Sequence, residues 1–290
     1  MLRQFGGAAV SPRVALVTCA ELPELGEDEP LLLDALRERG VDAQPAVWDD
    51  AAVDWRSYDL VVVRSAWDYS TRRDEFVAWA RSVPHLLNPA DVIEWNTDKR
   101  YLRTVPRAVA TTFVEPGDGW DPPAGEYVVK PAVSAGSRDT ARYRPGEEAE
   151  AREHVAALQA AGRTVMVQPY LGAVDTYGET ALLFFDGEYS HAIRKGQMLQ
   201  PGQAPTGEVI YLEEQISARE PEPEERAAAD EVLGALPWPR ESLLYARVDL
   251  IPGADGSPRV VELELTEPSL FLSYADGAPD RLAERVLKRL

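Results

Sequence analysis

The chain has few of the side chains that carry nucleophilic or zinc chemistry. Its 290 residues include one cysteine and three histidines. Cys19 cannot form an intramolecular disulfide and lies in an apolar run, so we expect a reduced thiol in the core. His85, His154 and His191 lack the spacing of a zinc site. There is no Gly-x-Ser-x-Gly motif and no Cys/His pairing, which disfavours a nucleophilic hydrolase.

Basic residues and long apolar runs are also scarce. The 30 Lys and Arg are outnumbered by 49 Asp and Glu, and the net charge of −19 disfavours sequence-independent binding to nucleic acid. A nucleotide stays open, because its site needs only a few cations placed locally. No window approaches the roughly 18 apolar residues of a membrane helix, and residues 1–12 are expected to be a loose end rather than a signal peptide. We expect a cytoplasmic protein without a nucleic-acid or membrane partner, with a homodimer as an open alternative.

Residues 13–87 alternate apolar runs with amphipathic segments. This pattern is typical of a parallel sheet in an open α/β lobe, whose ligands lie beyond the carboxyl ends of the strands. Arg64, Ser65 and Trp67 directly follow an apolar strand and are therefore candidate substrate-binding residues, although an aromatic side chain there can simply pack. We predict strands at 13–18, 41–48 and 60–63, and helices at 30–40 and 72–83.

The rest of the chain predicts two α+β lobes, at 88–166 and 167–290. A capped helix is expected within 88–101, and an Asp-Gly turn predicts a hairpin over 178–194. Residues 196–209, rich in Gly, Pro and Gln, are expected to form a polar loop. Further strands are predicted at 112–114, 126–130, 140–143 and 164–168, and further helices at 147–161, 221–236 and 279–290.

The C-terminal run Val260-Val-Glu-Leu-Glu-Leu-Thr-Glu-Pro-Ser269 predicts an acidic strand face. Strand side chains alternate with period two, so Glu262 and Glu264 point the same way. The turn residues at 252–258 join this run to the preceding apolar one as an antiparallel hairpin, which can bring Asp249 beside the two glutamates. Carboxylates this close are the ligands that Mg²⁺ prefers. A solvated acidic face is the simpler alternative from alternation alone.

Lys130 ends a predicted strand and enters a loop of small residues. The backbone of such a loop can approach a phosphate closely while the ammonium supplies charge, so Lys130, Ser134, Gly136 and Ser137 are candidate phosphate-site residues. The Gly-Lys-Ser/Thr spacing of a P-loop is absent. Alone, such a loop is more often a tight hairpin.

The order of these pieces resembles the ATP-grasp superfamily, and within it bacterial glutathione synthetase. The acidic run is similar to the superfamily's Glu-x-Asn-x-x-x-Pro pattern, with Glu264 where asparagine is usual. The runs at 96–101, 130–139 and 191–196 resemble the cyclo-ligases that close the D-cycloserine ring. The resemblance covers residues 13–290 in order and is stronger at the C-terminal motif than in the N-terminal lobe.

The resemblance implies an ATP-grasp fold in which two α+β lobes enclose ATP. Lys99 and Lys130 would lie near the phosphates, and Gln168, Pro169 and Tyr170 would meet adenine.

The resemblance assigns the remaining candidates to metal binding and catalysis. Glu179 would hold ribose or a metal-bound water. The three acids of the hairpin would hold two Mg²⁺ ions, with Mn²⁺ as an alternative metal. Charge on the transferring phosphoryl group would be neutralised by Arg194, Lys195 and Arg247.

The implied reaction is ATP-dependent formation of a carbon–nitrogen bond. ATP would phosphorylate a carboxylate or carbamoyl oxygen, and an amine would displace phosphate from the acyl phosphate, with residues 196–209 as a lid that excludes water. The ring-closing resemblance implies O-ureido-D-serine or a similar small amino-acid derivative as substrate. The alternatives are an intermolecular amino-acid or dipeptide ligase and a nucleotide-binding protein without turnover.

Overall fold

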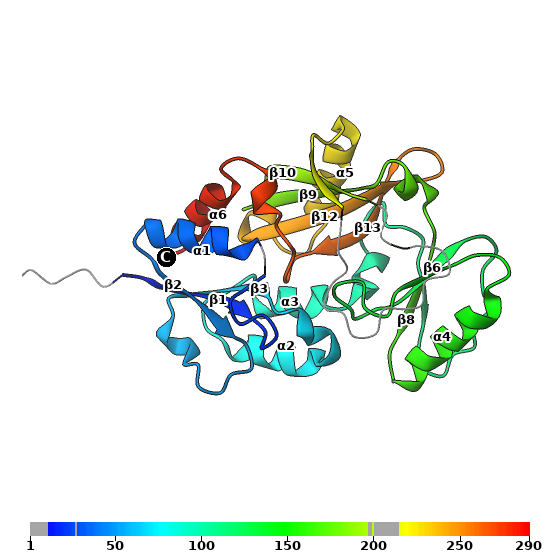
Figure 1. Cartoon of the computed structure of the whole chain (residues 1–290), viewed down its shortest axis with the longest axis horizontal. Helices are drawn as coiled ribbons and strands as arrows, with labels where there is room; N and C mark the ends of the chain where they lie inside the picture. The colour runs from blue at the N-terminus through cyan, green and yellow to red at the C-terminus, as the bar shows by residue number, and fades with distance from the viewer. Residues whose placement is uncertain (1–10, 27, 197–198, 200–214) are drawn as a thin grey trace, which may run out of the picture.

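Three sheets surround a common centre in the structure, which is a computed structural model describing residues 11–26, 28–196, 199 and 215–290. Figure 1 shows the N-terminal sheet at the lower left, the C-terminal sheet above it and the third sheet, with β6 and β8, on the right. Among the described residues, every helix is too short or too polar to span a bilayer. The predicted lid at 196–209 falls largely outside the described residues.

The N-terminal sheet is parallel, with strand order β2-β1-β3-β4, as the alternating pattern predicts. Its two faces follow the period of the strands: Ala15 and Val61 pack towards α2, whereas Leu16 and Val62 pack towards α1 and α6. The elements are β1 (Arg13–Thr18), α1 (Glu29–Glu38), β2 (Asp42–Val47), η1 (Trp55–Ser57), β3 (Leu60–Ser65), η2 (Trp67–Thr71), α2 (Arg73–Ser82) and β4 (Leu86–Leu87).

The helix predicted within 88–101 is two pieces, α3 (Ala90–Asn96) and the 3₁₀ turn η3 (Lys99–Arg103). Asn96 ends α3 because its side chain bonds a distant strand: its Nδ2 donates to the carbonyl of Leu263 at 2.8 Å, and its Oδ1 accepts from the amide of Leu265 at 2.7 Å. Asp98 then caps η3, accepting the amide of Arg100 at 3.0 Å. Both pieces pack with the C-terminal sheet, and the backbone amide of Lys99 donates to the carbonyl of Ala132 in the central lobe at 2.9 Å.

The central sheet is antiparallel, with order β5-β8-β6-β7. Tyr127 and Val129 of β6 face α4, and Val128 and Lys130 face the other way, towards the centre of the molecule. The predicted boundary at 166/167 falls inside β8. The elements are β5 (Thr112–Val114), β6 (Tyr127–Pro131), β7 (Ala141–Tyr143), α4 (Glu148–Ala160) and β8 (Val165–Pro169).

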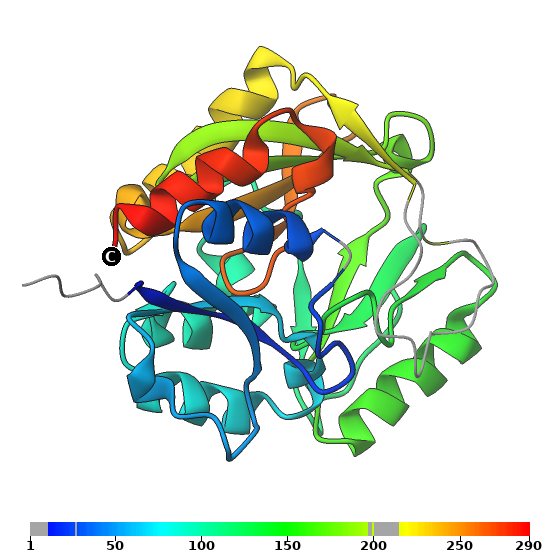
Figure 2. The ribbon, with the colours of Figure 1, turned by 60° about the vertical axis from the view of Figure 1, so that its left-hand side comes forward.

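The C-terminal sheet is antiparallel, with order β11-β10-β9-β12-β13, and both predicted hairpins are confirmed. At the β9–β10 turn, Asp186 and Gly187 have φ of 51° and 73°, the left-handed values that Asp-Gly turns adopt. One face packs on α5, and the other faces α1 and α6, which lie side by side (Figure 2). The elements are η4 (Gly172–Asp175), β9 (Glu179–Phe185), β10 (Glu188–Lys195), β11 (Ile216–Arg219), α5 (Pro223–Gly234), η5 (Arg240–Ser242), β12 (Tyr245–Pro252), β13 (Pro258–Glu264), η6 (Leu272–Tyr274) and α6 (Ala278–Leu287).

Candidate active site

A cavity of about 1030 Å³ lies where the three sheets meet. Its volume suits a ligand the size of a nucleotide together with a small substrate. The predicted site residues that line it are Trp67, Lys99, Lys130, Ser134, Gly136, Ser137, Gln168, Pro169, Tyr170, Glu179, Lys195, Arg247, Glu262 and Glu264. The fold therefore gathers residues that are up to 197 positions apart in the sequence, since the first is residue 67 and the last is residue 264.

The acidic hairpin forms in a register that brings Asp249 beside Glu262. Arg247 pairs with Glu264 and Asp249 with Glu262 across β12 and β13. Asp249 is buried, and it accepts from Lys195 Nζ at 2.9 Å and from Arg247 Nη2 at 2.8 Å. Burial opposes its ionisation, but the two cations outweigh burial and lower the pKa of Asp249.

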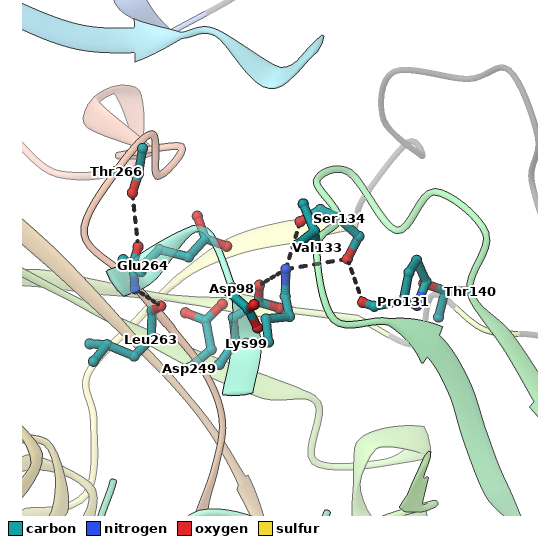
Figure 3. A network of polar contacts seen from close by, with 12 residues as sticks. Asp98, Lys99, Pro131, Val133, Ser134, Thr140, Asp249, Leu263, Glu264 and Thr266 are labelled. Carbon is teal, nitrogen blue, oxygen red and sulfur yellow. Dashed lines mark hydrogen bonds and ion pairs between the residues drawn. The ribbon is translucent and has the colours of Figure 1, made fainter. Parts of the chain in front are cut away.

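Lys99 joins the hairpin to the small-residue loop of the central lobe, as Figure 3 shows. Its ammonium donates to the carbonyl of Ser134 at 2.6 Å and to the hydroxyl of the same residue at 3.2 Å. It also lies 3.1 Å from Glu262 Oε1. Burial raises the pKa of Glu262, but Lys99 and Lys130 together lower it by more, so the net shift is downward.

Lys130 differs from the other cations of the cavity. Its ammonium makes no hydrogen bond or ion pair with any residue that the structure describes, and burial lowers its pKa. Beside it, Gly136 and Ser137 turn the loop with φ of 61° and 58°. A partly buried ammonium beside a tight loop has the chemistry of an anion site.

The segment at the end of β8 forms the cavity wall between the central and C-terminal sheets. Gln168 is buried and donates its amide to Thr111 Oγ1 at 3.0 Å, which fixes the carboxamide. The amide of Tyr170 donates to the carbonyl of Glu126 at 2.8 Å, and the Arg142 guanidinium lies 3.5 Å from the Tyr170 ring centroid. These contacts give the wall a defined shape beside Pro169.

Two carboxyls among the predicted site residues have raised pKa values. Glu179 lies 2.8 Å from Lys195 Nζ, yet burial raises its pKa to about 7. Burial likewise raises the pKa of Glu264 to about 7 although Arg247 contacts it, because Glu262 and Asp249 add negative charge. Burial therefore raises both pKa values by more than the adjoining cations lower them.

The prediction for Arg194 is wrong in its placement. Arg194 shares its side of β10 with Ala192, whereas Lys195 shares the cavity side with Ile193. The guanidinium donates to the carbonyls of Tyr177 at 2.6 Å and Thr176 at 3.1 Å, so it holds the turn before β9 rather than lining the cavity.

Two of the predicted substrate-binding residues are also placed elsewhere. Arg64 is fully buried: its Nη2 lies 2.6 Å from Glu29 Oε1 and donates to the carbonyl of Pro268 at 2.6 Å. Arg64 therefore does not line the cavity. Ser65 accepts the amide of Gly26 at 3.0 Å and does not line the cavity. Of the three, only Trp67 reaches the cavity.

Sequence reasoning missed further residues of the cavity wall, among them Glu267 and Phe271. The ring of Phe271 lies 6.0 Å from Lys195 Nζ and 5.6 Å from the guanidinium carbon of Arg247. Strand alternation could not find either residue, because β13 ends at Glu264. Only the position of Glu267 within the quoted acidic motif gave a signal.

The site has the oxygen donors that Mg²⁺ requires, but their side chains are not arranged around a common point. Asp249, Glu262 and Glu264 offer the oxygen atoms that Mg²⁺ prefers. Each of them contacts a lysine or arginine instead, and no three acidic, His or Cys side chains of the described residues stand close enough to form a metal cage. A bound cation would take over contacts that Lys99, Lys195 and Arg247 now make.

Comparison with known proteins places the chain among enzymes of cycloserine formation. A family description, the N-terminal domain of the D-cycloserine synthetase DcsG, matches residues 14–88. The chain is 40% identical to the cycloserine biosynthesis protein DcsG of Streptomyces lavendulae, over 96% of this chain and 98% of that protein. The chain belongs to the DcsG family.

The solved structures agree with this family membership. The crystal structure of the D-cycloserine synthetase DcsG matches with a TM-score of 0.85 and 38% identity, covering 96% of this chain and 99% of that one. A D-alanine–D-alanine ligase from Bacillus anthracis, solved with ATP, matches with a TM-score of 0.64 at 13% identity over 96% and 97% of the two chains. The expected ATP-grasp fold is thus confirmed for this DcsG family member.

Proposed function

We propose that the chain is an ATP- and Mg²⁺-dependent ligase that closes the D-cycloserine ring on O-ureido-D-serine. One observation carries the proposal: the ammonium of Lys130 and the carboxylates of Glu262 and Glu264 line one cavity, in a DcsG family member. An anion site facing an oxygen-donor site is what a nucleoside triphosphate with Mg²⁺ requires. A cytoplasmic location and a homodimer stay predictions.

ATP would lie along the central sheet. Its phosphates would contact Lys130, which has no partner among the described residues, together with Lys99 and the loop around Gly136. The adenine would lie against Gln168 and Tyr170, where fixed side chains define the wall. Binding would thereby give the Lys130 ammonium an anionic partner.

Mg²⁺ would be held by Glu262, Glu264 and Asp249 together with phosphate oxygens, and it would withdraw charge from the transferring phosphoryl group. Whether one or two ions bind, and whether Mn²⁺ substitutes, belongs to the same proposal. Arg247 is placed to assist, since it already lies between Asp249 and Glu264.

The reaction would begin when a carboxylate oxygen of O-ureido-D-serine attacks the γ-phosphorus and ADP leaves. The nitrogen that carries the carbamoyl group would then attack the acyl carbon, and phosphate would leave as the five-membered ring closes. D-Cycloserine has no carbamoyl group, so one water molecule must hydrolyse the bond between that group and the ring nitrogen, which releases carbon dioxide and ammonia. Holding both reacting groups in one molecule makes the second step intramolecular, which lowers its entropic cost.

The test is release of ADP from Mg²⁺-ATP with O-ureido-D-serine alone, and in parallel with a panel of D- and L-amino acids as separate acceptors. We expect ADP and D-cycloserine without an added acceptor, and a hydroxamate when hydroxylamine traps the acyl phosphate. ADP release that requires a second amine would support an intermolecular ligase instead. Glu264→Gln is expected to raise the Mg²⁺ requirement at least about 10-fold. Unchanged turnover in this variant would contradict the metal assignment.

A further inference from the structure

The segment from Leu265 to Leu270, which follows the acidic strand, is held in place by side chains from distant parts of the chain. Each of its six successive carbonyls accepts a hydrogen bond from a different side chain. From Leu265 to Leu270 the donors are Asn88 at 2.7 Å, Tyr245 at 2.9 Å, Trp67 at 3.1 Å, Arg64 at 2.6 Å, Arg247 at 3.1 Å and His191 at 2.9 Å. A segment with every carbonyl fixed is preorganised, as binding sites require.

This segment presents the carboxyl of Glu267 to the cavity. The side chain is 8% exposed, and the hydroxyl of Tyr69 donates to it. Within the described residues Glu267 has no ion pair, whereas Asp249, Glu262 and Glu264 each contact a lysine or arginine. Among the described residues it is therefore a buried acid of the cavity without an ion-pair partner.

The segment that directly follows Gly196 supplies no cation that could pair with Glu267. Residues 197–198 and 200–214, next to the cavity in sequence, contain no Lys, Arg or His. Lys99, which lowers the pKa of Glu267, is already committed to Ser134 and Glu262. Burial and the nearby Glu264 raise the pKa of Glu267 to about 8, as expected for a site that lacks positive charge.

A second acid of the cavity, Asp28, also has no ion pair among the described residues, but its carboxylate is used. It accepts the backbone amides of Leu272 and Ser273, the second at 2.9 Å. Glu29 is likewise used, because both of its oxygens pair with Arg64. Glu267 is thus the acid of this wall that stays available to a ligand.

We propose that the carboxylate of Glu267 binds the α-ammonium group of the amino-acid substrate and so sets which end of that substrate faces the acidic hairpin. The ammonium and carboxylate of an amino acid share one carbon, so an ammonium at Glu267 leaves the carboxylate within reach of Arg247, which bonds the same segment at Ser269. Tyr69 is a positioning residue that orients the Glu267 carboxyl. This inference rests on the proposed function, because it takes O-ureido-D-serine as the substrate.

The test compares two substrates in wild type and Glu267→Gln: O-ureido-D-serine, and 3-(ureidooxy)propanoic acid, which lacks only the amine. For O-ureido-D-serine we expect Glu267→Gln to raise KM roughly 10- to 100-fold, the effect of losing a hydrogen bond between charged groups, and to leave KM for ATP within about twofold. In the wild type, KM for the analogue should exceed KM for O-ureido-D-serine by a similar factor. In Glu267→Gln the two KM values should differ little.

Two further variants keep the result specific. Tyr69→Phe should raise KM for O-ureido-D-serine by a smaller factor and leave KM for the analogue unchanged. Asp28→Asn, the comparison acid, should have less effect on KM than Glu267→Gln; the reverse order would overturn the assignment. An equal loss for both substrates in Glu267→Gln would overturn it too. Wild-type protein without turnover of O-ureido-D-serine would refute the proposed function and the inference with it, whereas normal wild-type turnover with an unaffected Glu267→Gln would refute the inference alone.

Discussion

At the scale of single residues, the pKa of each carboxyl of the site reflects the balance between its burial and the charges around it. Asp249 contacts Lys195 and Arg247, and its pKa is lowered despite full burial. Glu267 is buried without such a partner, and its pKa rises to about 8. Asp249 and Glu267 therefore carry different charges at neutral pH, because both are desolvated and only Asp249 contacts cations.

The shift at Glu267 predicts how stability depends on pH. The pKa is raised from an ordinary 4.5 to about 8, so over this interval the native state keeps a proton that the unfolded chain releases. The stability contributed by this group is complete below the unfolded pKa and is lost as the pH rises through the native pKa. Relative to Glu267→Gln, the wild type should lose on the order of a few kcal/mol of unfolding free energy between pH 5 and pH 8.5.

Urea denaturation of both proteins without nucleotide or metal measures this difference. The other shifted acids remain in both proteins, so most of their contribution cancels. A stability difference that stays constant across the pH range would contradict the raised pKa.

The ammonium of Lys130 should destabilise the folded protein and strengthen the binding of ATP. Its ammonium is partly buried without a partner among the described residues, and burial lowers its pKa. Replacing it with methionine removes a costly charge, so Lys130→Met should raise the unfolding free energy by about 1 kcal/mol. The same change should raise KM for ATP on the order of 100-fold. Lys288→Met, on the last turn before the C-terminus, is the control and should change neither quantity; a destabilised Lys130→Met would show that the ammonium has a stabilising partner.

At the scale of helices and strands, local signals explain what the sequence could predict. Both hairpins of the C-terminal sheet have clear turn residues and strict alternation, and both form as expected. The break between α3 and η3 could not be predicted, because the partner of Asn96 lies 167 residues further along at Leu263. The same holds for Arg64, whose partners Glu29 and Pro268 come from opposite ends of the chain.

The turn into β9 gives a prediction at this scale. Gly178 has φ of +83°, and a Cβ added there would lie 2.6 Å from the carbonyl oxygen of Lys195. Gly178→Ala should therefore cost about 1 kcal/mol for the backbone conformation, and more for the clash. Because Glu179 and Lys195 adjoin the clash, kcat/KM should fall beyond what the lost stability explains.

Gly256→Ala is the matched control for this turn. Gly256 has φ of +80° with nothing within 4 Å of the added Cβ, so the substitution carries the backbone cost without the clash. Thermal unfolding and ADP release should separate the two variants. Equal effects of the two on activity would mean that the packing around Gly178 does not position the site.

At the scale of the whole molecule, the site depends on how the N-terminal sheet meets the C-terminal one. The expected division at 88 and 167 follows the chain, but α3 and η3 pack with the C-terminal sheet and β8 completes the central sheet. Periodicity reveals which face of an element is buried, and it does not reveal which other element buries it. The cavity, built from all three sheets, could therefore be anticipated as a set of residues but not as a shape.

The contact between the two sheets is centred on Arg64, which yields a prediction for the molecule as a whole. Its guanidinium is fully buried between Glu29 and the carbonyl of Pro268. Arg64→Met leaves the Glu29 carboxylate buried without its cation, which should cost about 3–5 kcal/mol. The double variant Arg64→Met/Glu29→Gln removes both charges, so most of that stability should return.

The double variant separates the two roles of Arg64. Its charge balance is restored, but Pro268 still lacks its donor, so the segment that presents Glu267 should stay loose. We expect urea denaturation to show recovered stability while KM for O-ureido-D-serine remains several-fold above that of the control Glu29→Gln. The double variant restores charge balance but not the hydrogen bond from Arg64 to the Pro268 carbonyl. Recovery of KM together with stability would therefore show that Arg64 serves only to neutralise Glu29. Persistent loss of substrate affinity in a stable protein would instead show that Arg64 helps to position the site through its bond to Pro268.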